Sequence, residues 1–78
     1  MQVNQSVKKK LQKHLGVNIK YHRTRLNITQ ENLSFDIGVD RSYITAIENG
    51  DKSPSLYCLY LLAKKFKIQL RDLLDINI

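Results

Sequence analysis

Apolar residues recur at helical spacing in the N-terminal third of the chain. From about residue 6 one apolar side chain returns every four positions: Val7, Leu11, Leu15 and Ile19. This spacing places the four side chains on one face of a single helix, directed at the core or at a partner. Gly16 lies within the stripe and costs about 1 kcal/mol relative to alanine, so a break there is an alternative to one continuous helix. Asn27, which tolerates a left-handed backbone, predicts a helix end near Leu26.

Two short apolar segments follow between Thr29 and Asn49. Each has helical spacing: Leu33 and Ile37 in the first, and Val39, Ile44 and Ile47 in the second. Thr29 and Asp40 stand where a side-chain oxygen can cap the start of a helix. Gly38 can take the left-handed conformation that ends the first of the two helices. The stretch therefore predicts a helix, a tight turn and a second helix.

Two further helices are expected after a loop at residues 49–54, where Asn, Gly, Asp, Ser and Pro cluster. Residues 55–67 predict a fourth helix with an inner stripe of Leu56, Leu59, Leu62, Ala63 and Phe66. Its other face is more apolar than a solvent-facing surface and carries Tyr57, Cys58, Tyr60 and Leu61. Residues 69–75 predict a short fifth helix. No segment alternates as a strand would, so the fold class is all-α, a compact five-helix domain.

The charge distribution adds a functional indication. The net charge is +6, and the residues from Met1 to Asn27 include seven basic side chains and no acidic one. Such a basic field favours phosphates as a partner, on nucleic acid or on an anionic membrane, and a merely solvated face is the alternative. The single Cys58 excludes an internal disulfide and indicates a reducing, intracellular setting. With a Met1 start and no apolar leader, a complete cytoplasmic protein is expected.

Other kinds of site and function can be weighed. An enzyme is not expected, since Ser42 and Cys58 have no histidine nearby in sequence and no cofactor motif occurs. No metal site is expected, because His14 and His22 lack further ligands at suitable spacing. A membrane-surface helix is disfavoured, since the apolar face opposite the lysines is expected to enter the core.

The outer face of the fourth helix and the C-terminal residues predict a homodimer interface, or alternatively a protein-binding face: Tyr57, Tyr60, Leu61, Ile76 and Ile78.

An ordered set of short motifs runs from Leu15 to Leu74. It comprises Leu15-Gly16, Ile19-Lys20 with Arg23, Thr29 to Leu33, Gly38-Val39, Ile44, Ile47 to Gly50, Pro54 to Leu56, Leu62-Ala63 and Asp72 to Leu74. In this the chain resembles the lambda-repressor/Cro type of helix-turn-helix domain, the Xre family. The resemblance implies a five-helix DNA-binding domain at residues 15–75, with the helix-turn-helix at its second and third helices. Residues 1–14 would be a basic extension of the first helix, and residues 76–78 a tail available for dimer contact.

The resemblance also implies roles for single residues. The third helix would lie in the major groove and contact bases through Arg41, Ser42, Thr45 and Ala46. Arg41 is the strongest candidate, because a guanidinium can pair bidentately with guanine, and a local salt bridge to Asp40 or Asp36 is the alternative. Contacts to phosphates would come from Gln30, Tyr43, Asn49 and Lys52. Arg23 and Glu48 would form a structural ion pair that fixes the recognition helix.

The function implied is that of a transcriptional regulator acting as a homodimer on double-stranded DNA. Its operator would be pseudo-palindromic, with half-sites about 34 Å apart. No cofactor, membrane partner or small-molecule effector is expected. The segment from Asp40 to Ile44, followed by Ile47-Glu48, is also similar to the controller proteins of restriction–modification systems. A phage- or plasmid-type repressor, an antitoxin of a toxin–antitoxin pair, and a protein-interaction module on the same scaffold are the alternatives.

Overall fold

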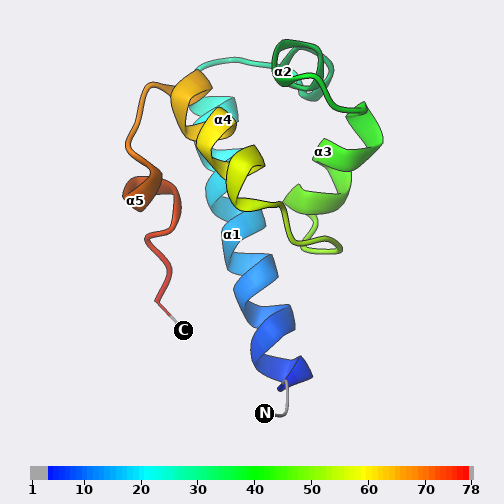
Figure 1. The fold of residues 1–78 in the computed structure, drawn as a ribbon, viewed down its shortest axis with the longest axis vertical. Helices are drawn as coiled ribbons and strands as arrows, with labels where there is room; N and C mark the ends of the chain where they lie inside the picture. Colours follow the sequence, from blue (N-terminus) through cyan, green and yellow to red (C-terminus); the bar gives the residue numbers. More distant parts are fainter. Residues whose placement is uncertain (1–3, 78) are drawn as a thin grey trace.

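A single long helix organises the molecule, and four shorter helices pack around its C-terminal half (Figure 1). The computed structural model describes residues 4–77. The helices are α1 (Gln5–Arg25), α2 (Gln30–Ile37), α3 (Arg41–Glu48), α4 (Leu56–Phe66) and α5 (Leu70–Leu73). Within residues 4–77 no strand occurs, so the all-α prediction is confirmed. In the view of Figure 1, α3 lies to the right of α1, α5 to its left, and α4 in front of it.

The α1 helix is continuous through Gly16, so the alternative of a break there is wrong. The helix begins at Gln5, one residue before the predicted start, because the Asn4 side chain accepts from the amides of Ser6 and Val7 at 3.0 and 3.2 Å. Gly16 is buried against α3, and a Cβ at this position would lie 2.5 Å from the carbonyl oxygens of Ile47 and Glu48. The glycine therefore allows two helix backbones to approach closely.

The predicted apolar stripe of α1 packs only in its C-terminal half. Leu15 and Ile19 are buried in the core, whereas Val7 is 46% exposed and Leu11 is 44% exposed. The N-terminal half of the helix extends below the other four helices, and no neighbouring helix covers it (Figure 1). The prediction that Val7 and Leu11 serve the domain's own core is therefore wrong.

The second and third helices form the expected helix-turn-helix. Thr29 caps α2, since its Oγ1 accepts from the amide of Asn32 at 3.0 Å. Gly38 ends α2 with a left-handed backbone, at φ 78°. Asp40 stands at the start of α3, but the prediction that its side chain caps the helix is wrong. The amide of Tyr43, a normal target of a capping oxygen, donates instead to the carbonyl of Asp40 itself at 3.0 Å.

The fourth helix buries a face slightly rotated from the predicted one. Its buried residues are Cys58, Leu59, Leu62, Ala63 and Phe66. The face follows Cys58, Leu62 and Phe66 at four-residue spacing and leaves Leu56 at its edge, where it is 69% exposed. The predictions that Leu56 belongs to the inner stripe and that Cys58 lies on the outer face are therefore wrong.

The short α5 helix and the chain after it are fastened to α1. Leu73 is fully buried, and Ile76 packs partly buried against the core. The Asn18 side chain donates from Nδ2 to the carbonyl oxygens of Leu73 and Asp75, at 3.2 and 3.1 Å. These bonds hold the C-terminal segment beside the middle of α1.

Candidate nucleic-acid interface

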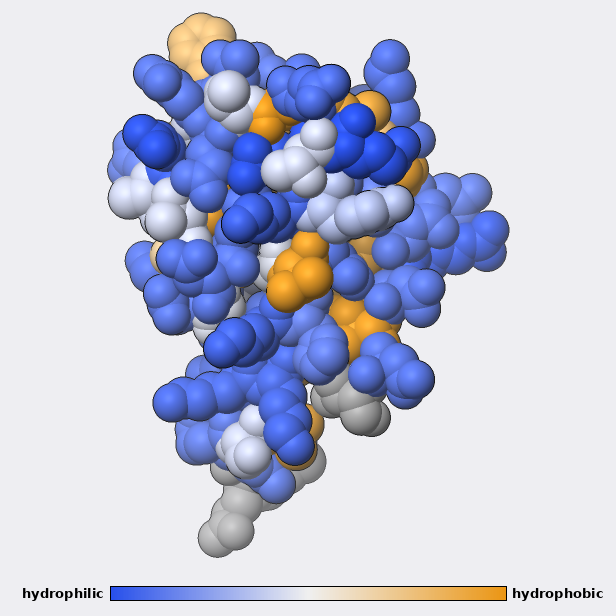
Figure 2. All heavy atoms as spheres, turned by 180° about the vertical axis from the view of Figure 1, so that it is seen from behind, coloured by the Kyte–Doolittle hydropathy of each residue, from blue (hydrophilic) through white to orange (hydrophobic). Residues whose placement is uncertain are grey.

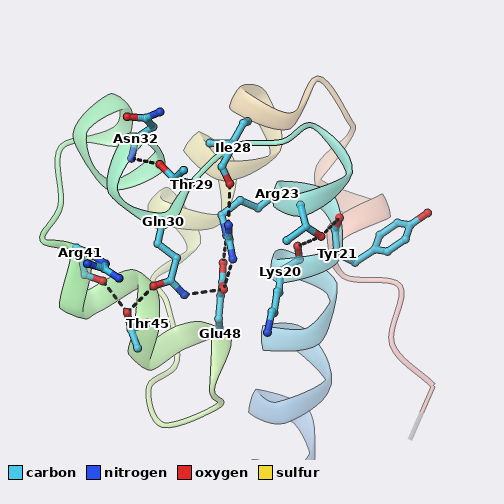
Figure 3. Close-up of polar contacts among 11 residues, drawn as sticks. Lys20, Tyr21, Arg23, Ile28, Thr29, Gln30, Asn32, Arg41, Thr45 and Glu48 are labelled. Atoms are coloured by element: carbon cyan, nitrogen blue, oxygen red, sulfur yellow. Dashed lines mark hydrogen bonds and ion pairs between the residues drawn. The ribbon is translucent and has the colours of Figure 1, made fainter.

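A buried ion pair joins α1 to α3 beneath the surface of the helix-turn-helix (Figure 3). Arg23 donates from Nε to Oε2 of Glu48 at 2.6 Å and from Nη2 to Oε1 at 3.0 Å. Its Nη1 donates to the carbonyl oxygen of Ile28 at 2.7 Å. The two residues are only 8% and 7% exposed. Removing either partner would leave an uncompensated buried charge, so this pair fixes α3 against α1. It is the pair that the family resemblance implies.

Gln30, the first residue of α2, links this ion pair to the recognition surface. Its Nε2 donates to Oε1 of Glu48 at 3.0 Å, and its Oε1 accepts from Oγ1 of Thr45 at 2.8 Å (Figure 3). The opposite amide orientation would set the amide oxygen against the carboxylate of Glu48, so the hydrogen-bond network assigns this one. Within residues 4–77 the amide retains one N–H that these bonds leave unused. That donor is half-buried at the start of a helix, where the backbone also favours an anion.

The hydrogen bonds of Thr45 restrict what its hydroxyl can offer to a ligand. Its Oγ1 lies 2.8 Å from Oε1 of Gln30 and 3.2 Å from the carbonyl oxygen of Arg41, and both neighbours are acceptors. A hydroxyl has one proton, which either bond directs into the protein. Thr45 therefore presents lone pairs to the outside and acts there as an acceptor only.

The remaining base-contact candidates share the outer face of α3. Arg41 and Ser42 are exposed at its N-terminus, and Ala46 is half-buried one turn later. Among the described residues Arg41 makes no ion pair, while Asp36 pairs with Lys65 at 2.6 Å. The predicted alternative, a salt bridge from Arg41 to Asp36 or Asp40, is therefore not formed. The guanidinium is available to a partner outside the chain.

The candidate phosphate-contacting residues fall into two kinds. Asn49 and Lys52 are exposed, in or next to the loop that connects α3 to α4. Tyr43 is half-buried, and burial, followed by the neighbouring Cys58 thiol, raises the pKa of its phenol. The Lys52 ammonium lies 5.9 Å from the centre of the Tyr43 ring. Tyr43 therefore packs partly against α4, with the Lys52 ammonium near its ring, rather than projecting freely into solvent.

The candidate dimer residues lie on α4 and the C-terminal segment. Tyr57 and Tyr60 are exposed and Leu61 and Ile76 are half-buried, while Ile78 lies outside the described residues. Sequence reasoning missed Phe35 on α2, which is 85% exposed. Phe35 shares with Tyr57 and Leu61 the lining of a groove of about 750 Å³ between the ends of α2 and α4. Only the spacing of Phe35 from the inward Leu33 and Ile37 could have indicated its outward direction.

Neither a metal site nor a membrane span occurs in the described part of the chain. Residues 4–77 contain no group of three His, Cys, Asp or Glu side chains that could hold a metal ion. None of the described helices combines the length and apolarity that crossing a bilayer requires. The candidate functional surface is the one formed by α2, α3 and the loop after α3.

Known proteins resemble this chain in sequence and in fold. Residues 19–73 match the family described as Helix-turn-helix. Over 55 residues the chain is 42% identical to an uncharacterized HTH-type transcriptional regulator of Methanocaldococcus jannaschii, and the match covers 70% of this chain and 83% of the relative.

Solved structures of two restriction-modification controller proteins have a similar fold. C.AhdI from Aeromonas hydrophila superposes with a TM-score of 0.76 at 34% identity, covering 80% of this chain and 94% of that one. C.Esp1396I, solved as a tetramer in complex with its natural 35 base-pair operator, gives a TM-score of 0.68 at 25% identity, over 83% and 96% of the two chains. The predicted helix-turn-helix fold is confirmed by these similarities.

Proposed function

The chain belongs to the helix-turn-helix family, and from this premise we propose that it is a transcriptional regulator that binds double-stranded operator DNA as a homodimer. The observation that carries the proposal is the outer face of α3. Arg41 and Ser42 are exposed there and Arg41 has no ionic partner among the described residues. The helix that presents them is fixed from behind by the buried pair of Arg23 and Glu48. We propose no catalytic role for the chain. Its proposed place of action is the cytoplasm.

The outer face of α3 would read bases in the major groove. The Arg41 guanidinium would donate two hydrogen bonds to the O6 and N7 atoms of a guanine. Thr45 would accept from an exocyclic amino group, on adenine or cytosine, since its proton is used within the protein. Ser42 can donate or accept, and the methyl group of Ala46 would meet a thymine methyl.

Contacts to the DNA backbone would flank the recognition helix. The unused N–H of the Gln30 amide and the N-terminus of α2 favour a phosphate on one side of the helix-turn-helix. On the other side, Asn49 and Lys52 would bind phosphates, with Lys52 held close to the ring of Tyr43. Such contacts set the register of α3 on the duplex and make binding depend on salt.

Dimerisation would double the contacts and match the symmetry of an operator. We propose that Tyr57, Tyr60 and Leu61 of α4, with Ile76 of the C-terminal segment, meet the same residues of a second copy. The exposed tyrosines supply the aromatic surface that is enriched in such interfaces. The half-sites would lie about 34 Å apart, one turn of the duplex.

Among regulators, the controller proteins of restriction–modification systems are the class that the proposal favours. The likeness to C.AhdI spans 94% of that chain at 34% identity, which supports this choice. A phage- or plasmid-type repressor would use the same fold and the same contacts.

The test is selection of bound duplexes from random DNA, followed by salt titration of binding to the selected sequence. Arg41→Ala should relax the preference at one position of each half-site, at about 1–3 kcal/mol. Lys52→Ala should weaken binding to all sequences alike and lower the salt slope by about 1. No enriched sequence, or an affinity that salt does not reduce, would reject the proposal.

A further inference from the structure

The N-terminal half of α1 lies outside the matched family region and carries a concentrated positive charge. The family match begins at residue 19, whereas α1 begins at Gln5. Between these points lie four exposed lysines and no acidic residue: Lys8, Lys9, Lys10 and Lys13. Figure 2 shows that the lower part of the molecule is mostly hydrophilic on the face seen from behind. Residues 5–13 therefore have a composition suited to phosphate, and none of them is buried in the core.

Two contacts hold this half of α1 against the loop that follows α3. Gln12 donates from Nε2 to the carbonyl oxygen of Gly50 at 3.1 Å. Gly50 has a left-handed backbone, at φ 79°, and a Cβ on it would lie 2.9 Å from the Cα of Lys13. The loop backbone and the helix backbone are thus in direct contact. This part of the α1 backbone, which carries the lysines, is consequently held beside the loop that carries Asn49 and Lys52.

The space between the helix and the loop is a groove with an excess of positive charge. Its volume is about 520 Å³, and four lysines of α1 line it together with Asn49 and Gly50. Asp51 is the only acidic side chain in the lining. A groove with four ammonium groups and one carboxylate attracts a polyanion, and its amide side chains from Gln12 and Asn49 can donate to phosphate oxygens.

We propose that this basic face of α1 is an additional phosphate-binding surface that extends the DNA contact beyond the helix-turn-helix. The inference rests on the proposed function, because the occupant is the duplex that α3 reads. One DNA strand would lie at Asn49 and Lys52 of the α3–α4 loop, and Lys13 lies against Gly50 of that loop. The other groove lysines, Lys8, Lys9 and Lys10, would meet further phosphates beside it. The contact carries no sequence information, since lysines on a backbone bind all sequences alike.

The test compares two double variants of the full-length chain that remove equal charge. Lys9→Gln/Lys13→Gln removes two lysines of the groove. Lys67→Gln/Arg71→Gln, the far-end variant, removes two exposed cations at the C-terminal end of α4 and on α5, which lies on the other side of α1 from α3 (Figure 1). Affinity is measured against salt for the selected operator duplex and for a scrambled duplex of equal length. Circular dichroism melting of both variants checks that the fold is retained, which is expected because all four side chains are exposed.

The groove variant should bind both duplexes about tenfold more weakly at moderate salt. Its salt slope should be lower by about 1 to 2 per protomer, because each phosphate that the protein no longer neutralises reduces the slope by about 0.9. The far-end variant should keep the wild-type slope. Equal weakening in the two variants, or an unchanged slope in the groove variant, would overturn the inference while leaving the proposed function intact. If the wild-type chain itself bound no DNA, both would fail.

Discussion

Replacing Gly16 by alanine should separate α1 from the recognition helix. The added Cβ would lie 2.5 Å from the carbonyl oxygens of Ile47 and Glu48 and 2.8 Å from the carbonyl carbon of Glu48. All three atoms belong to the backbone of α3, so no side-chain rotation can relieve the overlap. Ordinary contact requires α3 to move outward by about 1 Å, which loosens interior packing that tolerates little change.

The magnitude follows from two opposing effects. Overpacking of an interior position destabilises a protein by about 1–3 kcal/mol, and overlap with three backbone atoms belongs at the upper end of that range. Alanine improves helix propensity over glycine by about 1 kcal/mol in the opposite direction. The net expectation is a loss of about 2 kcal/mol. In a domain of this size each kcal/mol lowers the melting temperature by about 4–8 °C, so Gly16→Ala should melt about 10 °C lower.

Thermal melting followed by far-UV circular dichroism measures this loss, and the next residue supplies the control. Val17 is exposed on the same helix, so Val17→Ala tests helix propensity without a contact to α3. Val17→Ala should melt at or slightly above the wild-type temperature. If Gly16→Ala also melted at or above that temperature, propensity would dominate and the account of the close approach would be refuted.

Three further outcomes are expected. Glu48→Ala should lower the free energy of unfolding by about 3 kcal/mol in a urea titration, because it strands the buried Arg23 guanidinium, and an unchanged midpoint would contradict the structural role of the pair. Thr45→Val should lose the preference for a base with an exocyclic amino group in a binding selection, whereas Thr45→Ser should keep it; equal profiles would exclude Thr45 as an acceptor. Burial, followed by the charge of Arg25, lowers the pKa of His22 below its usual 6.5. The contribution of the neutral His22 to the free energy of unfolding should therefore be present in full above pH 6.5 and should fall as the pH drops below it. His22→Gln should reduce that fall, and a pH dependence that survives His22→Gln unchanged would refute this expectation.

The helices themselves could be predicted because their signals are local. Thr29 and Gly38 each act on the backbone within a few residues, and the structure places helix ends beside both. The apolar periodicity shows which face of a helix is apolar, but not whether another helix reaches it. That is why the prediction of a core position for Leu11, which lies beyond the reach of the bundle, is wrong.

The rotation of α4 could not be predicted for a related reason. Leu56 and Cys58 are both compatible with a buried position by residue type, and the choice between them depends on how the helix is rotated against α1. The structure buries Cys58 and exposes Leu56. Such rotation is decided by packing among helices distant in sequence, which the local pattern does not contain.

The arrangement behind the recognition surface depends still more on tertiary structure. Gln30 and Thr45 are 15 positions apart, and Gln30 and Glu48 are 18 apart. Family resemblance suggests a role for each residue separately, but not that one amide binds both a carboxylate and a hydroxyl. The acceptor-only character of Thr45 follows from that geometry and could not be predicted without it.

The central claim is that α3 reads a DNA sequence, and the ratio of two affinities tests it most directly. Affinities for the selected operator duplex and for a scrambled duplex are measured at the same salt concentration, for the wild-type chain and for Arg41→Ala. The wild-type chain should prefer the operator by at least about 10³-fold. Arg41→Ala should reduce that ratio by about tenfold or more, with little change in the affinity for scrambled DNA. A wild-type ratio close to one, or a ratio that Arg41→Ala leaves unchanged, would contradict the account.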